Sequence, residues 1–268
     1  MKRSLLALGI MALTCLPALA GKNQGGALVV HSRDEAWFSN ACDWFDYLYP
    51  DITCPELDTR SDKPDYDTAL IWFIAAFPPY ANPGVKVIYF GLDHNLPPDL
   101  GYIEGRMFCG PDGSFEYPDA GWPEYPATAG NSLTFGTAVV DDLLFPFYVF
   151  RVYGFAGAYF CTHINPVAGY ASFVDNSDPP VQDVITKFGC VRWYQEGYNG
   201  CPAEGPLGAC CYGSLECAVL TEEECGDLPD DYLWIEGEVC DPNPCPTSDV
   251  PEPTIRETTW GSIKAVYK

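Results

Sequence analysis

Basic residues are scarce in this sequence. Lys and Arg number 14 against 37 Asp and Glu, which gives a formal net charge of −23. A chain with this charge repels nucleic acid phosphates and anionic lipid headgroups, so we expect neither as a partner. The charge does not exclude cations, cationic surfaces or neutral polymers such as glycans as ligands.

Long apolar runs are also missing. After residue 20, no segment approaches the 18 apolar residues of a membrane helix. The first twenty residues, MKRSLLALGIMALTCLPALA, combine a basic start, a short apolar run and the small-residue site Ala18-Leu19-Ala20. We therefore expect a cleaved signal peptide over 1–20 and an exported protein, extracellular or at the cell surface, with no transmembrane segment. Removal of the signal peptide changes the net charge from −23 to −25, because residues 1–20 carry Lys2, Arg3 and no acidic residue.

No C-x-x-C pair occurs, and histidines number only three, so the cysteines do not fit a redox motif or a common zinc site. Removing Cys15 with the signal peptide leaves twelve of the thirteen cysteines. Export and an even count predict six disulfides. The simplest pairs in the first part of the chain are Cys42–Cys54, Cys109–Cys161 and Cys190–Cys201. The remaining six, Cys210, Cys211, Cys217, Cys225, Cys240 and Cys245, are expected to pair among themselves in an undecided order, with Cys210 and Cys211 taking different partners.

Composition divides the mature chain into two folded parts. We expect a β-sandwich domain over 22–201, a linker over 202–207, a cysteine-rich module over 208–246, a second linker over 247–253 and a C-terminal tail over 254–268. Aromatic and β-branched runs between Pro, Gly, Asn and Asp turns predict strands in the first part, and no helical pattern alternates with them. The fold class is thus mainly β, an antiparallel sandwich with a small disulfide-rich module and a short C-terminal helix. The predicted strands are Ala27–His31, Thr68–Phe77, Lys86–Leu92, Ser132–Phe135, Leu143–Tyr153, Ala158–Cys161 and Cys190–Tyr194, with Pro146 at a bulge or an edge.

Two helical patterns interrupt this β pattern. Apolar residues of Asp34–Tyr49 follow helical spacing, which predicts a helix laid across the sandwich. In the cysteine-rich module, Thr221-Glu222-Glu223-Glu224 forms a capping box that predicts one helical turn with Cys225 facing inward. The module has too few apolar side chains to fold alone, so its three disulfides and Trp234 are expected to hold it together.

Several stretches resemble known proteins. The CC pair, the capping-box turn, the Trp and the closing C-x4-C-P are similar to a small module of secreted proteins from uncultivated bacteria. The stretches GALVVH, AAFPPYANPGVKVIYFGLD and FGCVRWYQEGYNGCP resemble exported proteins of such bacteria. The resemblance implies export but no activity and no site residues.

Three aromatic residues are candidates for ligand binding. Tyr117, Trp122 and Tyr125 lie in FEYPDAGWPEYPATAG, a stretch rich in Pro and Gly that predicts a loop. Exposed aromatics on such loops bind sugars or proteins. Burial of the loop as an anchor is the alternative, and it stays open.

Metal binding has two candidate locations. Asp175 and Asp178 in DNSD could bind calcium, although this stretch lacks the glycine and distal glutamate of an EF-hand. His31, His94 and His163 each fall near a predicted strand end and could share a metal if those ends met. Three independent histidines are the alternative. No residue is assigned a catalytic role.

The tail TIRETTWGSIKAVYK is basic, with a side-chain net charge of +2 on an acidic chain. Trp260, Ile263 and Tyr267 fall on one face of a short helix that is marginal by itself. We expect it to dock, either on a sorting receptor in the envelope or on the protein's own acidic domain; a disordered tail is the remaining alternative. As a whole, the sequence favours an exported, non-catalytic binding or envelope-structural protein with a glycan or surface polymer as ligand. The alternative is a secreted, glycosidase-like hydrolase using acids in a sandwich cleft.

Overall fold

A computed structural model describes residues 21–34, 38–63, 67–97, 102–124, 129–203, 205, 207–213, 216–228, 232–237, 240 and 244–245. The expected signal peptide, the second linker and the C-terminal tail with its helix lie outside these residues. No helix in the described part of the chain is long and apolar enough to cross a membrane.

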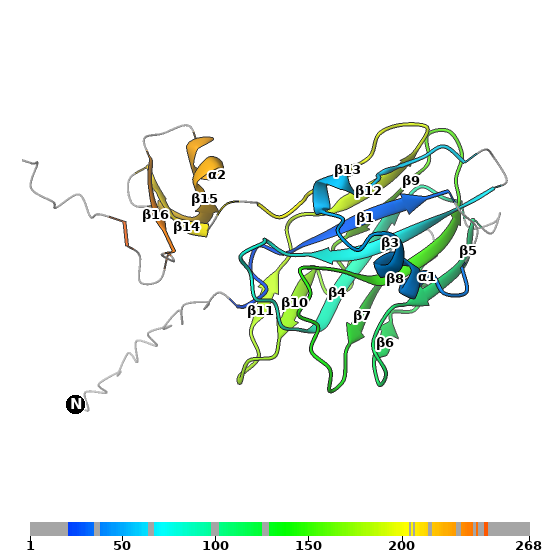
Figure 1. Ribbon diagram of the computed structural model, residues 1–268, viewed down its shortest axis with the longest axis horizontal. Helices are drawn as coiled ribbons and strands as arrows, with labels where there is room; N and C mark the ends of the chain where they lie inside the picture. The colour runs from blue at the N-terminus through cyan, green and yellow to red at the C-terminus, as the bar shows by residue number, and fades with distance from the viewer. Residues whose placement is uncertain are drawn as a thin grey trace, which may run out of the picture.

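The first part of the chain is a sandwich of two mainly antiparallel sheets (Figure 1). Sheet A has four strands in the order β1-β3-β8-β5, and sheet B has nine, with β11-β10-β4-β9-β12-β13 as its main path. Strands β7 and β6 continue sheet B beyond β4, and β2 pairs with β12 in parallel. Sheet A comprises β1 (Ala27–Arg33), β3 (Thr68–Ala76), β5 (Ile103–Phe108) and β8 (Leu144–Tyr153). Sheet B comprises β2 (Arg60–Ser61), β4 (Val85–His94), β6 (Phe115–Pro118), β7 (Gly130–Thr134), β9 (Tyr159–His163), β10 (Ser172–Asp175), β11 (Gln182–Val184), β12 (Gly189–Trp193) and β13 (Tyr198–Asn199).

All seven predicted strands are present, and the sandwich class is confirmed. Pro146 lies at a bulge, as predicted: Phe73 pairs with Tyr148 and Ile74 pairs with Pro146, so Phe147 has no partner on β3. Bulges are positions where a strand tolerates proline. Between the sheets lies a core dominated by aromatic side chains, among them Phe73, Phe90, Phe147, Phe150, Phe160, Phe173 and Trp193.

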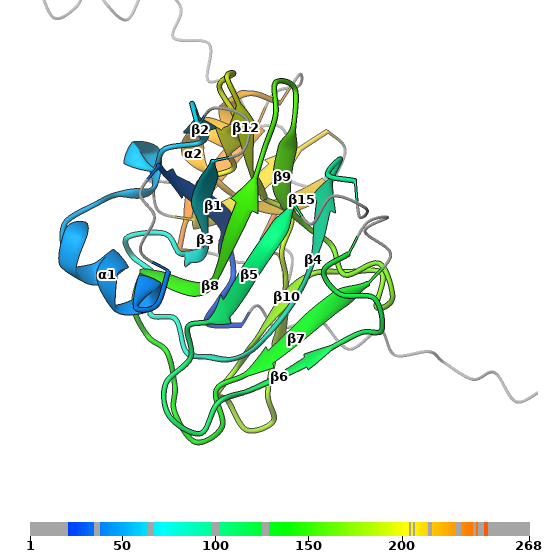
Figure 2. The ribbon, with the colours of Figure 1, turned by 90° about the vertical axis from the view of Figure 1, so that its right-hand side faces the viewer.

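A second apolar cluster covers the outer face of sheet A. Helix α1 (Ala41–Leu48) and the 3-10 turn η1 (Cys54–Glu56) lie outside this sheet, so the predicted helix across the sandwich is confirmed, with a shorter described span (Figure 2). Phe45 of α1 packs on Trp72 of β3, and the Trp72 Nε1 donates a hydrogen bond to the Ala41 carbonyl at 2.8 Å. Strand β3 is therefore buried on both faces, which explains its continuous run TALIWFIAA.

The pairing of the first six cysteines differs from the prediction. The bonds are Cys42–Cys109, Cys54–Cys201 and Cys161–Cys190, so Cys42–Cys54, Cys109–Cys161 and Cys190–Cys201 were wrong. The prediction paired neighbours in the sequence, whereas the fold pairs neighbours in space. Two of the bonds fasten the α1 segment to the sandwich. The third joins residues that face each other in β9 and β12.

The cysteine-rich module is a three-stranded sheet with one helical turn. It contains β14 (Leu207–Tyr212), β15 (Glu216–Thr221), α2 (Glu222–Gly226) and β16 (Tyr232–Glu236), in the order β15-β14-β16. The capping box is present: Glu224 N donates to Thr221 Oγ1, Thr221 N donates to the Glu224 carboxylate, and Cys225 is fully buried. The bonds Cys210–Cys225, Cys211–Cys245 and Cys217–Cys240 confirm pairing within the module and separate partners for the adjacent cysteines.

The module touches the sandwich through an ion pair. Lys187 Nζ lies 2.9 Å from Glu224 Oε1. Glu224 is also the capping residue of α2, so one carboxylate joins the helical turn to the sandwich. Both side chains are partly exposed, so the pair orients the module more than it stabilises it.

Candidate functional site

The two outer faces of the sandwich differ in exposure. The outer face of sheet A lies under α1, whereas sheet B carries large exposed side chains. Phe115 and Tyr117 of β6 are 57% and 62% exposed. Contiguous exposed apolar groups on a folded domain mark interaction surfaces, so this face is a candidate binding surface.

The residue between these two side chains sets their direction. Glu116 points inward, where its Oε2 accepts hydrogen bonds from Tyr148 Oη at 2.9 Å and from Asn131 Nδ2 at 3.2 Å. Because successive side chains of a strand alternate between faces, Phe115 and Tyr117 must point outward. Burial raises the pKa of Tyr148, and the adjacent Glu116 charge raises it further, so the phenol stays protonated and able to donate.

Strand register extends this surface across sheet B. Tyr117 pairs with Ser132 of β7, and Ser132 pairs with Tyr89 of β4. Phe115 pairs with Thr134 in the neighbouring row. Adjacent strands lie about 4.8 Å apart, so Tyr117 and Tyr89 are separated by about 10 Å with a hydroxyl between them. We call Phe115, Tyr117, Ser132, Thr134 and Tyr89 the aromatic face.

A loop borders the aromatic face on one side. Gly91 of β4 pairs with Gly130 of β7 at the end of the pairing between these two strands. A Cβ on Gly91 would lie 2.1 Å from the Ile164 carbonyl oxygen. Glycine is therefore required for the segment between β9 and β10 to cross the sheet there. The same segment ends at Tyr170, whose ring meets Tyr89 edge to face at 5.8 Å. The aromatic face thus has a fixed border.

The three predicted ligand-binding residues have different environments. Tyr117 is exposed but lies in strand β6, so its assignment to a loop was wrong. Trp122 is only 6% exposed, and its ring packs edge to face on Phe90 with the ring centroids 5.2 Å apart. It is therefore buried as an anchor of its segment, which was the alternative to ligand binding. A ring buried to this extent offers no surface to a ligand. Tyr125 lies outside the described residues.

A groove beside α1 gathers acidic residues. It has a volume of about 830 Å³ and lies between α1, the end of β5 and the segment 138–146. Asp43 and Asp46 of α1 face it from one side, and Asp141 and Asp142 from the other. Partial burial raises the pKa of Asp46, and the charges of Asp142 and Asp43 raise it further. We call these four aspartates and the apolar residues between them the acidic groove.

The structure does not bring the three histidines together. His31 lies under α1, where its Nδ1 accepts from Asp58 N at 3.0 Å and burial lowers its pKa to about 4. His94 is buried with its Nε2 3.1 Å from the Pro123 carbonyl, and burial lowers its pKa as well. His163 is exposed on the outer face of β9 and stacks on Phe188. They form no shared metal site in the described part of the chain.

Asp175 organises the loop in which calcium was predicted. Its Oδ1 accepts from Ser177 N at 3.0 Å and Val181 N at 2.8 Å, and its Oδ2 accepts from Ser177 Oγ at 2.8 Å. These hydrogen bonds hold its pKa below the usual range against the effect of burial. Both oxygens of Asp175 already accept hydrogen bonds, Oδ1 from the loop backbone and Oδ2 from the Ser177 hydroxyl, while Asp178 is exposed. Calcium at this pair stays a prediction.

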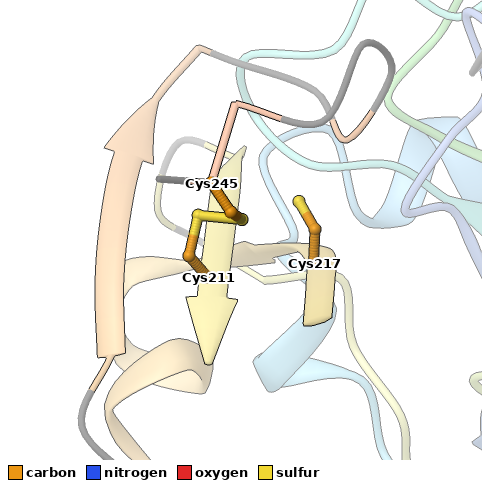
Figure 3. A group of neighbouring side chains, drawn as sticks. All are labelled: Cys211, Cys217 and Cys245. Atoms are coloured by element: carbon orange, nitrogen blue, oxygen red, sulfur yellow. A yellow bond between two sulfur atoms is a disulfide. The ribbon is translucent and has the colours of Figure 1, made fainter. Parts of the chain in front are cut away.

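Among the described residues, one group of His, Cys, Asp or Glu is close enough to share a metal ion. It consists of Cys211, Cys217 and Cys245, with ligand atoms within 4.8 Å of one another (Figure 3). Cys211 is bonded to Cys245 and Cys217 to Cys240. A disulfide sulfur has no thiolate to offer a metal, so this group is part of the scaffold.

The chain matches no protein-family model and no curated protein. The aromatic face and the acidic groove are the two candidate functional surfaces of the sandwich. Sequence reasoning missed Phe115 and the outward direction of Tyr89. The alternation Phe115-Glu116-Tyr117 is the signal of a half-exposed strand that could have identified the first of them.

Proposed function

We propose that this is an exported, non-catalytic binding protein whose aromatic face binds a glycan or another neutral envelope polymer. The observation that carries the proposal is the exposed pair Phe115 and Tyr117, held outward in register with the hydroxyls of Ser132 and Thr134. A sugar ring has an apolar face of C–H groups that stacks on an aromatic ring, and hydroxyls at its edge that need hydrogen-bond partners. The aromatic face offers both.

The charge of the chain supports a neutral polymer. A net charge of −23 disfavours anionic polysaccharides, as it does nucleic acid. Within the aromatic face, the named side chains are aromatic or hydroxylic, and none is a carboxylate, an amine or a guanidinium. A flat surface spanning three strands suits an extended chain better than a small molecule, which prefers an enclosed pocket.

Export is part of the same proposal. The first twenty residues have the pattern of a signal peptide, and six disulfides join all twelve remaining cysteines. Disulfides at this density persist in oxidising compartments outside the cytosol. A position at the cell surface would place the aromatic face among envelope polymers.

The test is a pull-down of the mature protein with insoluble neutral polysaccharides and with envelope fractions, with and without calcium. Tyr117→Ala should weaken capture about 5- to 30-fold, because an aromatic side chain at the centre of an interface contributes about 1–2 kcal/mol. Tyr47→Ala is the matched control: Tyr47 is a more exposed tyrosine, at 83%, on α1 outside the other sheet. Equal capture by both variants and the parent protein would remove the aromatic face as the binding surface.

A hydrolase is the alternative, and the acidic groove is the observation in its favour. Glycoside hydrolysis needs one carboxyl group kept protonated and a second one ionised across a cleft. Asp46 has a raised pKa and faces Asp142 across the groove. Turnover of a polysaccharide that is abolished by Asp46→Asn or Asp142→Asn would establish the hydrolase. Binding without turnover supports our proposal.

A further inference from the structure

The acidic groove has an apolar floor beneath its charged rim. Phe45 and Ile52 from the α1 side line it together with Met107 of β5 and with Leu144 and Phe145 of β8. The disulfide Cys42–Cys109 crosses the floor and fixes α1 against the end of β5. A groove of about 830 Å³ is within the range of pockets that enclose several ligand groups. Its floor can therefore take apolar side chains.

The rim of the groove carries charge of one sign. Asp43, Asp46, Asp141 and Asp142 are all exposed, and no Lys or Arg is among the described residues that line the groove. Like charges gathered on a partly apolar surface repel one another, and burial raises the pKa of Asp46 with a further contribution from the charges of Asp142 and Asp43. A cationic occupant would relieve this repulsion.

The C-terminal segment has the complementary chemistry. Residues 254–268 carry Arg256, Lys264 and Lys268 against Glu257, a side-chain net charge of +2. The rest of the mature chain, residues 21–253, has 9 basic and 36 acidic residues, a net charge of −27. Trp260, Ile263 and Tyr267 supply apolar groups at helical spacing. Cations beside an apolar face match a groove that has an acidic rim and an apolar floor.

We propose that the segment 254–268 folds back and docks in the acidic groove of its own chain. In this arrangement Lys264 and Lys268 pair with the rim aspartates, and the side chains of Trp260 and Tyr267 pack on the floor. The proposal is independent of the aromatic face, which lies on the other sheet, and it would stand if that face bound nothing.

The segment is long enough to reach the groove. Between Cys245 and Trp260 lie 14 residues, which span at most about 50 Å when extended. A domain of this size has a radius of gyration of about 16 Å and hence a diameter of about 40 Å. The tether before Trp260 is therefore longer than the sandwich is wide.

A second acidic surface lies closer to the tail in the sequence. Glu222, Glu223 and Trp234 line a hollow of about 460 Å³ in the module. Its apolar lining is smaller, with Trp234 as the one aromatic residue, so it offers less area to bury. This hollow is the alternative docking site for the segment 254–268, and the test distinguishes the two sites.

The test is zero-length carboxyl–amine cross-linking of the full-length mature protein, followed by peptide mapping. We expect Lys264 and Lys268 to cross-link to the four aspartates of the groove. The triple variant Asp46→Asn, Asp141→Asn, Asp142→Asn should lower the yield of tail cross-links about fivefold or more. The matched control, Glu222→Gln, Glu223→Gln, Asp227→Asn, removes three acids from the module and should leave the yield unchanged. All six positions are exposed, so both variants should fold.

Three results would overturn the proposal. One is cross-links concentrated on Glu222 and Glu223; another is cross-links spread over all exposed acids or absent altogether. The third comes from mixing isotopically labelled and unlabelled protein: if every tail cross-link joins two different copies, the segment does not dock on its own chain. Loss of the cross-links at high salt, with the control variant behaving as the parent, supports docking through charge.

Discussion

Replacing Trp122 with Ala tests the central distinction between the two aromatic residues, Trp122 and Tyr117. Trp122 is 6% exposed and lies within the core of the sandwich. Its ring centroid is 5.2 Å from Phe90, 6.2 Å from Phe150 and 6.4 Å from Tyr148. Truncating a tryptophan in such a site removes its contacts and leaves a cavity that the surrounding rings fill only in part.

The expected cost is about 3–5 kcal/mol of unfolding free energy, from the range for Trp or Phe to Ala in a core. A domain of this size loses about 2–4 °C of melting temperature per kcal/mol, so Trp122→Ala should melt roughly 6–20 °C lower. Tyr117→Ala is the partner measurement. Its side chain is 62% exposed, and the change should alter the unfolding free energy by no more than about 0.5 kcal/mol.

Urea denaturation of the oxidised mature protein measures both costs, and polysaccharide capture is measured on the same samples below the melting temperature. Trp122→Phe should recover most of the stability, because a phenyl ring refills much of the space. The reasoning is refuted if Trp122→Ala costs less than about 1 kcal/mol. Loss of capture together with unchanged stability would instead make Trp122 a ligand contact.

Four further predictions follow from the described contacts. Alkylation without reductant should label no thiol, and peptide mapping should recover Cys54–Cys201 rather than Cys42–Cys54. Burial lowers the pKa of His31 to about 4, below the value of about 6.5 in an unfolded chain, so its contribution to stability is complete above pH ~6.5 and is lost as the pH falls toward 4. His31→Gln should flatten that fall, whereas His163→Gln, at an exposed site, should not. Asp175→Asn should lower the melting temperature with or without calcium, because the carboxylate holds its own loop; a calcium-dependent rise in the parent protein alone would restore the ion site. Deleting Thr254–Lys268 should leave both sheets and the module folded, and if the tail is also an address, cell fractionation should find the truncated protein in the medium rather than with the cells.

Much of the fold could be predicted because its signals are local. The run TALIWFIAA is apolar at every position, and the structure buries it between α1 and the core. Thr221 and Glu224 are three residues apart, and a capping box depends on that separation alone. The placement of Pro146 at a bulge follows from its missing N–H group.

Disulfide pairing in the sandwich could not be predicted in this way. Cys42 and Cys54 are twelve residues apart, yet both lie on the segment over sheet A and bond to Cys109 and Cys201 instead. The register of β9 against β12 brings Cys161 opposite Cys190. The order of the strands determines which cysteines come within bonding distance. No local sequence pattern specifies that order.

The candidate sites show the same division. The sequence by itself determined that aromatic residues gather near 115–125, that the chain is strongly acidic, and that its last fifteen residues are basic. Only the tertiary structure decided that Tyr117 is exposed while Trp122 is buried, because the inward hydrogen bonds of Glu116 turn its neighbours outward. It also brought Asp46 and Asp142 to the same groove from positions almost a hundred residues apart. Whether a side chain meets solvent or core depends on which surfaces pack together, and that depends on contacts between distant parts of the chain.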